Sequence, residues 1–117
     1  MRDAVIVSTA RTPIGRAYKA ALNNLPAPSL GGHAIQNAVA RAGIDPASVD
    51  DVVMGAALTQ GSGGMNIGRL AGLAGGLPVT VAGMTLDRQC SSGMYAIATA
   101  ANSIRTGDTN IMVAGGL

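Results

Sequence analysis

The only cysteine of the chain stands where its type and its neighbours suit covalent chemistry. Cys90 lies in the stretch TLDRQCSSGM, residues 85–94, after an apolar run and before a helical pattern. This order places the thiol at the carboxyl end of a strand, where a helix opens and where open α/β folds bind their ligands. Unpaired N–H groups and the partial positive charge of a helix start stabilise a thiolate and a developing oxyanion. The setting favours a nucleophile that attacks a carbonyl carbon.

A structural role for the same thiol is the competing interpretation. A lone cysteine in an α/β domain is more often a small buried hydrophobe than a nucleophile. Ser91, Ser92 and Gly93 keep the side-chain bulk beside Cys90 low, so that a substrate carbonyl has room to approach the sulfur. Exposure of the sulfur, rather than burial in a core or within a strand, is what the nucleophile interpretation requires.

The other residues capable of chemistry are weaker candidates. His33 is the only histidine, and its place in a helical pattern favours a helix-surface or interface residue over a catalytic one. Residues 60–68, QGSGGMNIG, lack the Lys-Ser/Thr ending of a phosphate-binding loop and favour a turn. Met65 and Met94 are expected to fill gaps in the core rather than to line an acyl channel.

Composition excludes several classes of protein. The 117 residues are 48% hydrophobic and 12% charged, without Phe or Trp, which indicates one compact domain packed by aliphatic side chains. A net charge of +2 is too small for a nucleic-acid surface, although Arg11, Arg16 and Arg69 remain unassigned candidates for phosphate contacts. The apolar run near the N-terminus is too short for a signal peptide or a membrane span. One cysteine excludes an internal disulfide and indicates a reducing compartment, the cytoplasm.

Apolar patterning predicts strands and helices in strict alternation, which is typical of an α/β protein with a mostly parallel sheet and helices on both of its faces. Gly43 and Gly107 are expected to end two of the helices, and Ser29 to cap the first. Met94, Ile97, Ala98, Ala101 and Ile104 share one face of the last helix. Strands are expected at residues 4–9, 50–58, 81–86 and 110–117, and helices at 29–42, at 67–74 and in a last helix that Cys90 opens and Gly107 ends.

The segment TLDRQCSSGMYAIATAANSI resembles the active-site cysteine segment of thiolases, the acetyl-CoA acetyltransferase and 3-ketoacyl-CoA thiolase family. The resemblance extends upstream through DAVIVSTARTPIGR and VDDVVMGAALTQGSGGMNIGRLAGLAGGLP, and downstream through GDTNIMVAGGL. It covers essentially the whole chain in the order of the family. It implies that residues 1–117 are a partial thiolase N-terminal domain, without the loop domain and the C-terminal domain.

The resemblance implies an acyltransferase of fatty acid metabolism in which Cys90 is the catalytic nucleophile. Cys90 would take an acyl group from acyl-CoA as a thioester and pass it to coenzyme A or to an acetyl-CoA carbanion. Coenzyme A and acyl-CoA are then substrates, no cofactor or metal is permanently bound, and neither nucleic acid nor membrane is a partner. The resemblance also implies a homodimer or homotetramer for the full-length protein, with residues 81–86, VAGMTL, as the candidate dimer contact.

Two departures from the family pattern qualify this interpretation. Asp87 stands where many thiolases carry Asn, and the Gly-His-Pro motif and second cysteine of the family are absent from these residues. Without them Cys90 lacks its usual activating base, so we expect the isolated chain to be inactive. The alternatives are a ketoacyl synthase, which is distant because its sequences lack this Cys-Ser-Ser-Gly setting, and a non-catalytic truncated dimerisation module.

Overall fold

A three-stranded parallel sheet forms the centre of the protein. The computed structural model describes residues 1–117. Strand β1 (Asp51–Gly55) lies between β2 (Ala82–Leu86) and β3 (Met112–Gly116), and both pairings are parallel. The parallel α/β architecture expected from the sequence is therefore confirmed.

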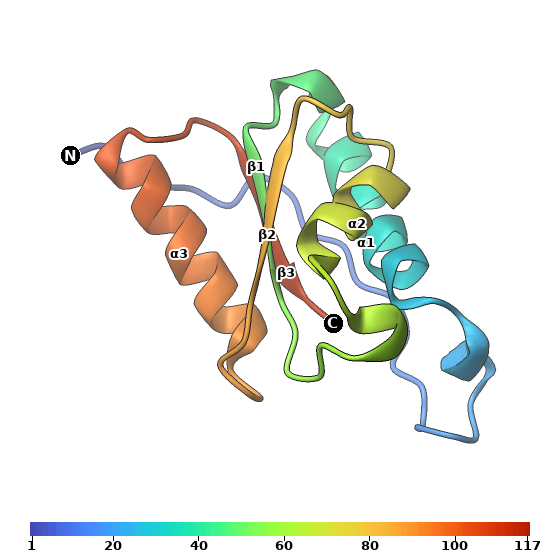
Figure 1. The fold of residues 1–117 in the computed structure, drawn as a ribbon. Coiled ribbons are helices and arrows are strands. Elements are labelled where there is room, and N and C mark those ends of the chain that lie inside the picture. Colours follow the sequence, from blue (N-terminus) through green and yellow to red (C-terminus); the bar gives the residue numbers. More distant parts are fainter.

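Helices cover both faces of this sheet, as Figure 1 shows. α3 (Ser92–Thr106) packs on β1 and β3 from one side, whereas α2 (Ile67–Ala74) packs on β1 and β2 from the other, with α1 (Ala27–Ala42) against it. None of the helices combines the length and the apolar character needed to cross a membrane. Three short 3-10 turns complete the structure at Ala21–Asn24, Pro46–Ser48 and Gly61–Gly63.

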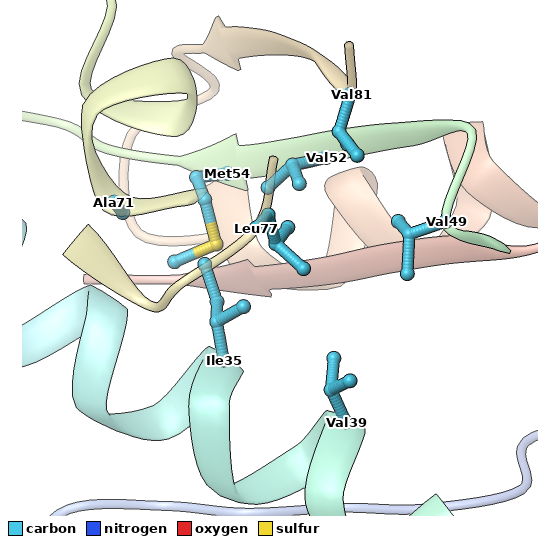
Figure 2. Packing of buried hydrophobic residues seen from close by; sticks show 8 residues of the cluster. All are labelled: Ile35, Val39, Val49, Val52, Met54, Ala71, Leu77 and Val81. Atoms are coloured by element: carbon cyan, nitrogen blue, oxygen red, sulfur yellow. The ribbon is translucent and has the colours of Figure 1, made fainter. Parts of the chain in front are cut away.

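The main core lies between the sheet and the helix pair α1 and α2. Figure 2 shows Ile35 and Val39 pointing from α1 toward the strands. Val52 and Met54 of β1 belong to this core, and the alternation of side chains along a strand sends Val53 to the face that α3 covers. The core cluster consists of Ile35, Val39, Val49, Val52, Met54, Ala71, Leu77 and Val81.

The strand expected at residues 4–9 is not formed. The segment has no strand neighbour, and Val5, Ile6 and Val7 are 73–75% exposed. It is held near its ends instead: the Arg2 guanidinium donates to the carbonyl oxygens of Ile104 and Thr109 and to the side chain of Asn110, and Arg41 donates to Thr9. The apolar pattern is that of a strand, but residues 4–9 pair with neither outer edge of the sheet, so the pattern alone does not produce a strand here.

The helix boundaries agree with those predicted from the sequence, except at the starts of α1 and α3. Residues 67–74 form a helix as expected, and Gly43 and Gly107 end α1 and α3 in left-handed conformations, with φ of 67° and 89°. Ser29 is not the N-cap of α1, because the helix begins two residues earlier, at Ala27. Pro28 fits a first helical turn, where its missing N–H costs nothing, so the helix extends back past the serine.

Helix α3 buries a different stripe from the one expected. Ser92, Ala96 and Ala100 are its buried residues, which recur at four-residue spacing and face the sheet. Of the apolar residues predicted to share a face, Met94 and Ile97 are 72% and 46% exposed. Small side chains pack against the sheet because they let the helix approach it closely.

Candidate active site

The turn between β2 and α3 carries the thiol. Cys90 is exposed, so it is neither sealed in the core nor placed within a strand. It lies just before Ser91, the N-cap of α3, and so stands outside the first helical turn rather than in it. The exposure that the nucleophile interpretation requires is present.

The residue before the cysteine adopts a left-handed backbone conformation. Gln89 has φ of 50°, which costs a residue with a Cβ on the order of 1–2 kcal/mol. The Asp87 carboxylate offsets part of this cost by accepting a hydrogen bond from the Gln89 backbone N–H at 2.8 Å, with the Gln89 side-chain amide nearby at 3.3 Å. Asp87 thus acts as a local turn former.

The Ser92 hydroxyl closes this turn from the helix side. It accepts a hydrogen bond from the Arg88 N–H at 2.8 Å and donates to the Gln89 carbonyl oxygen at 2.6 Å, and the residue is buried. Sequence reasoning missed this role, because it considered the serine pair only as small residues beside the cysteine. The signal that does exist is a serine two positions after a candidate nucleophile, where its hydroxyl can reach back to the preceding turn.

Backbone amides expected to be free at the start of α3 are partly occupied. The N–H groups of Ser91 and Ser92 donate to the carbonyl oxygens of Arg88 and Gln89 at 3.2 and 3.0 Å. The expectation that these amides stand open for an oxyanion is wrong for both, because the tight turn before the helix already uses them. The partial positive charge of the helix start remains, since it arises from the alignment of the peptide groups.

Glycine contacts bring the start of α3 onto the carboxyl ends of two strands. A Cβ on Gly55, the last residue of β1, would overlap the backbone of Ser92. A Cβ on Gly116, the last residue of β3, would lie 2.8 Å from the Cα of Gly93. Only residues without side chains permit this approach, and it places the Cys90 turn at the carboxyl end of the sheet.

A groove of about 1490 Å³ opens beside the thiol. The unpaired segment of residues 4–17 lines it on one side, and faces of α1, α3 and β3 line the other. Cys90, Gly93 and Met94 stand in its wall, which is mostly apolar.

The remaining candidates from the sequence lie elsewhere or differ from expectation. His33 is exposed on α1, where its ring lies 3.5 Å from the Asn37 side chain, in agreement with a helix-surface role. Met65 and Met94 do not fill the core: they are 90% and 72% exposed, because Met65 sits in the loop before α2 and Met94 faces the groove. Residues 60–68 form a turn that runs into α2, as expected.

The three arginines considered for phosphate contacts separate in the structure. The Arg69 guanidinium donates to the carbonyl oxygens of Val79 and Val81, so it ties α2 to the start of β2. Arg11 and Arg16 are exposed in the N-terminal segment beside the groove. A fourth arginine, Arg88, was not considered for such contacts. Its guanidinium carbon lies over the Tyr95 ring, 4.4 Å from the ring centroid.

Comparison with known proteins identifies relatives over nearly the whole chain. Residues 4–117 match the family described as thiolase, N-terminal domain. The chain is 47% identical to the acetyl-CoA acetyltransferase of Cupriavidus necator and 40% identical to the 3-ketoacyl-CoA thiolase of Bacillus subtilis, each over 116 residues and 99% of this chain. It spans only 29% and 30% of the length of these curated relatives.

A solved structure supports the same relationship. The crystal structure of the Bacillus anthracis acetyl-CoA acetyltransferase superposes with a TM-score of 0.91 at 43% sequence identity. The superposition covers 99% of this chain and 29% of that one.

Proposed function

Because the chain belongs to the thiolase family, as its N-terminal domain, we propose that it is part of an acyl-CoA C-acyltransferase in which Cys90 is the nucleophile. The observation that carries the proposal is the exposed thiol at the start of α3, in the wall of an apolar groove. The acetyl-CoA acetyltransferase and 3-ketoacyl-CoA thiolase relatives support acyl-CoA as the class of substrate.

The proposed reaction is an exchange of thioesters. The Cys90 thiolate attacks the carbonyl carbon of acyl-CoA, a carbon–sulfur bond to Cys90 forms, and the bond to the coenzyme A sulfur breaks. Coenzyme A leaves with the electron pair and takes up a proton. The acyl group then passes either to another coenzyme A or to an acetyl-CoA carbanion, and Cys90 is regenerated as a thiolate. Little energy separates the two thioesters, so either direction is accessible.

An electrostatic argument supports Cys90 as the reacting group. The start of α3 presents the positive end of the helix dipole within one turn of the sulfur, and an anion there is favoured. A reducing compartment such as the cytoplasm would keep this thiol free.

The general base of the reaction is proposed to lie outside residues 1–117. His33 is the only histidine and is exposed on α1, hydrogen-bonded to Asn37 of the same helix. No Gly-His-Pro motif and no second cysteine occur in the sequence. We therefore expect the chain by itself to form a thioester slowly and not to turn over.

The apolar groove supports the proposal that these residues are one portion of a larger domain. Val5, Ile6 and Val7 follow a strand pattern but pair with no strand. β3 is an edge strand of the sheet, with β1 as its one strand partner. Relatives extend over about three times the length of this chain. We propose that a strand from that additional length occupies the groove and covers its apolar wall.

A second candidate function is a non-catalytic dimerisation module, favoured by the outer edge of β2, which pairs with no strand. Only β1 pairs with β2, although on the other edge the side chains of Arg69 and Asn66 donate to the carbonyl oxygens of Val81 and Gly83. A strand edge without a strand partner is a site for pairing with a second copy, which would have to displace these two side chains. Residues 81–86 thus support a homodimer, or a homotetramer built from it, in either function. Light scattering on the purified chain distinguishes a monomer from a dimer.

The proposed function is tested by mapping the acyl adduct. The protein that carries this domain together with the remaining thiolase domains is mixed with acetyl-CoA, digested and analysed by mass spectrometry. We expect one acetyl group on the peptide that contains Cys90, and neither adduct nor turnover in Cys90→Ala. His33→Ala is the matched control and should keep both, because His33 lies on the exposed surface of α1. Turnover by Cys90→Ala would refute the proposal, and the absence of both adduct and turnover in the unchanged protein would support the module.

A further inference from the structure

The Ser92 side chain makes an unusual pair of contacts for a helix residue. Ser92 is the first residue of α3 and is only 4% exposed. Its hydroxyl accepts from the Arg88 N–H at 2.8 Å and donates to the Gln89 carbonyl oxygen at 2.6 Å. One hydroxyl therefore binds the backbone of two consecutive residues, Arg88 and Gln89, just before Cys90.

This double contact holds a backbone that would not keep its shape unaided. Gln89 is left-handed, with φ of 50°, and Asp87 supports only its N–H side. The carbonyl side of Gln89 is held by the hydroxyl and the N–H of Ser92, at 2.6 and 3.0 Å. Without the hydroxyl, the Arg88 N–H loses its partner and the turn loses its direct side-chain link to α3.

We propose that Ser92 is the positioning residue for the nucleophile, holding the turn of residues 88–91 so that the Cys90 sulfur stays at the start of α3 and in the groove wall. The proposal rests on the proposed role of Cys90. The favourable electrostatic field of a helix start falls off within about one helical turn. If residues 88–91 moved away from α3, the Cys90 sulfur would leave this field. Ser92 cannot itself touch the substrate, because its hydroxyl is buried and both of its hydrogen bonds are made within the protein.

The neighbouring serine offers a matched control. The Ser91 hydroxyl donates to the Arg88 carbonyl oxygen at 2.8 Å, and the Ser91 N–H donates to the same oxygen. Ser91→Ala removes a hydroxyl of the same size one residue away and leaves the Arg88 carbonyl with a donor. Both links made by Ser92 stay in place in this variant.

The test uses the single thiol of the chain as its own reporter. The second-order rate of Cys90 alkylation by iodoacetamide is measured at neutral pH for the unchanged chain, both folded and unfolded in urea. The same rate is measured for folded Ser92→Ala, Ser92→Thr and Ser91→Ala, at a temperature below the melting temperature of each variant. We expect the folded chain to react faster than the unfolded one. Ser92→Ala should react about tenfold more slowly than the folded unchanged chain, because the two hydrogen bonds of the Ser92 hydroxyl are missing. Ser92→Thr, which keeps the hydroxyl, and Ser91→Ala should stay close to the unchanged chain.

The possible failures are distinguishable. A folded Ser92→Ala chain that reacts as fast as the unchanged chain, while melting at a lower temperature, would mean a purely structural role and overturn the proposal. An unchanged chain that reacts no faster than in urea would contradict activation of Cys90 itself, and the positioning role with it. Failure of Ser92→Thr to restore the rate, in a chain that is folded, would show that the hydroxyl is not the group responsible.

Discussion

Gly55 and Ser92 meet backbone to backbone, at the point where the last residue of β1 lies against the first residue of α3. A Cβ added to Gly55 would overlap the carbonyl group of Ser92 and crowd the N–H of Gly93. The atoms that would have to move are backbone atoms of the helix start, not the end of a flexible side chain. The contact therefore determines how near the Cys90 turn lies to the sheet.

Gly55→Ala should destabilise the protein and disturb the reactive turn together. The added methyl group has no space, and overpacking of this kind costs about 2–3 kcal/mol. Urea unfolding should show this loss of free energy, and the folded variant should alkylate Cys90 more slowly than the unchanged chain.

Gly72→Ala is the comparison for that experiment. A Cβ at Gly72 would meet Val52 at 3.4 Å and Leu77 at 3.6 Å, which are ordinary contacts within the core. Alanine is also favoured over glycine inside a helix by about 1 kcal/mol. The variant should be as stable as the unchanged chain or more so, and an equal loss in both variants would contradict the steric argument for Gly55.

Asp50 should make stability depend on acid pH. The backbone N–H groups of Asn110 and Ile111 donate to its carboxylate at 2.6 and 3.0 Å and hold the pKa of Asp50 below the usual 3.8, with a smaller contribution from Arg2. Because the folded pKa is the lower one, the stabilisation is complete above about pH 5 and is lost as pH falls through the folded value.

Asp50→Asn isolates this effect. The variant should be less stable than the unchanged chain at neutral pH, by less than about 1 kcal/mol, because water screens an exposed carboxylate. The difference in melting temperature should shrink as pH is lowered below about 4 and vanish in stronger acid. A difference that stays constant with pH would show that the two backbone hydrogen bonds do not depend on the charge.

Local chemistry made some of the elements predictable from the sequence. The helix at 67–74 begins after Asn66, whose side chain caps it, and ends at a pair of glycines, so its limits are encoded within a few residues. Gly43 and Gly107 end their helices for the same local reason. The segment at residues 4–9 was mispredicted because pairing depends on what lies beside a strand, and its own residues do not encode that.

The candidate site likewise has features that the sequence predicts and features that it does not. The position of Cys90 between a strand and a helix follows from the patterns on either side of it. The occupation of the Ser91 and Ser92 amides does not, because it depends on the left-handed turn at Gln89, a residue with no evident preference for that conformation. Met94 was mispredicted as a core residue because an apolar helix face is buried only where something packs against it.

Ile6→Asp tests whether a further strand covers the groove. Ile6 is 75% exposed in this structure, so the substitution should change the free energy of unfolding of the 117-residue chain by less than about 0.5 kcal/mol. In the protein that carries the additional thiolase domains, the same carboxylate would be buried in an apolar wall and should cost at least about 2 kcal/mol. Lys19→Asp, at an exposed position outside the groove lining, is the control and should have a small effect in both. Equal small effects of Ile6→Asp in both proteins would leave no role for a covering strand.

Asn66→Asp separates helix capping from the tie between α2 and β2. The Asn66 side-chain oxygen accepts from the Arg69 N–H at 3.2 Å and from the Thr85 hydroxyl at 2.9 Å, while its amide nitrogen donates to the Gly83 carbonyl oxygen at 2.7 Å. Asp and Asn are about equal as N-caps, so capping alone predicts no change. Asp instead turns a carboxylate oxygen toward the Gly83 carbonyl oxygen, and we expect a loss of at least about 1 kcal/mol in urea unfolding. Below about pH 4 the protonated carboxyl can donate to that carbonyl, so the loss should diminish. An Asp variant as stable as the unchanged chain at neutral pH would mean that the Gly83 contact contributes nothing.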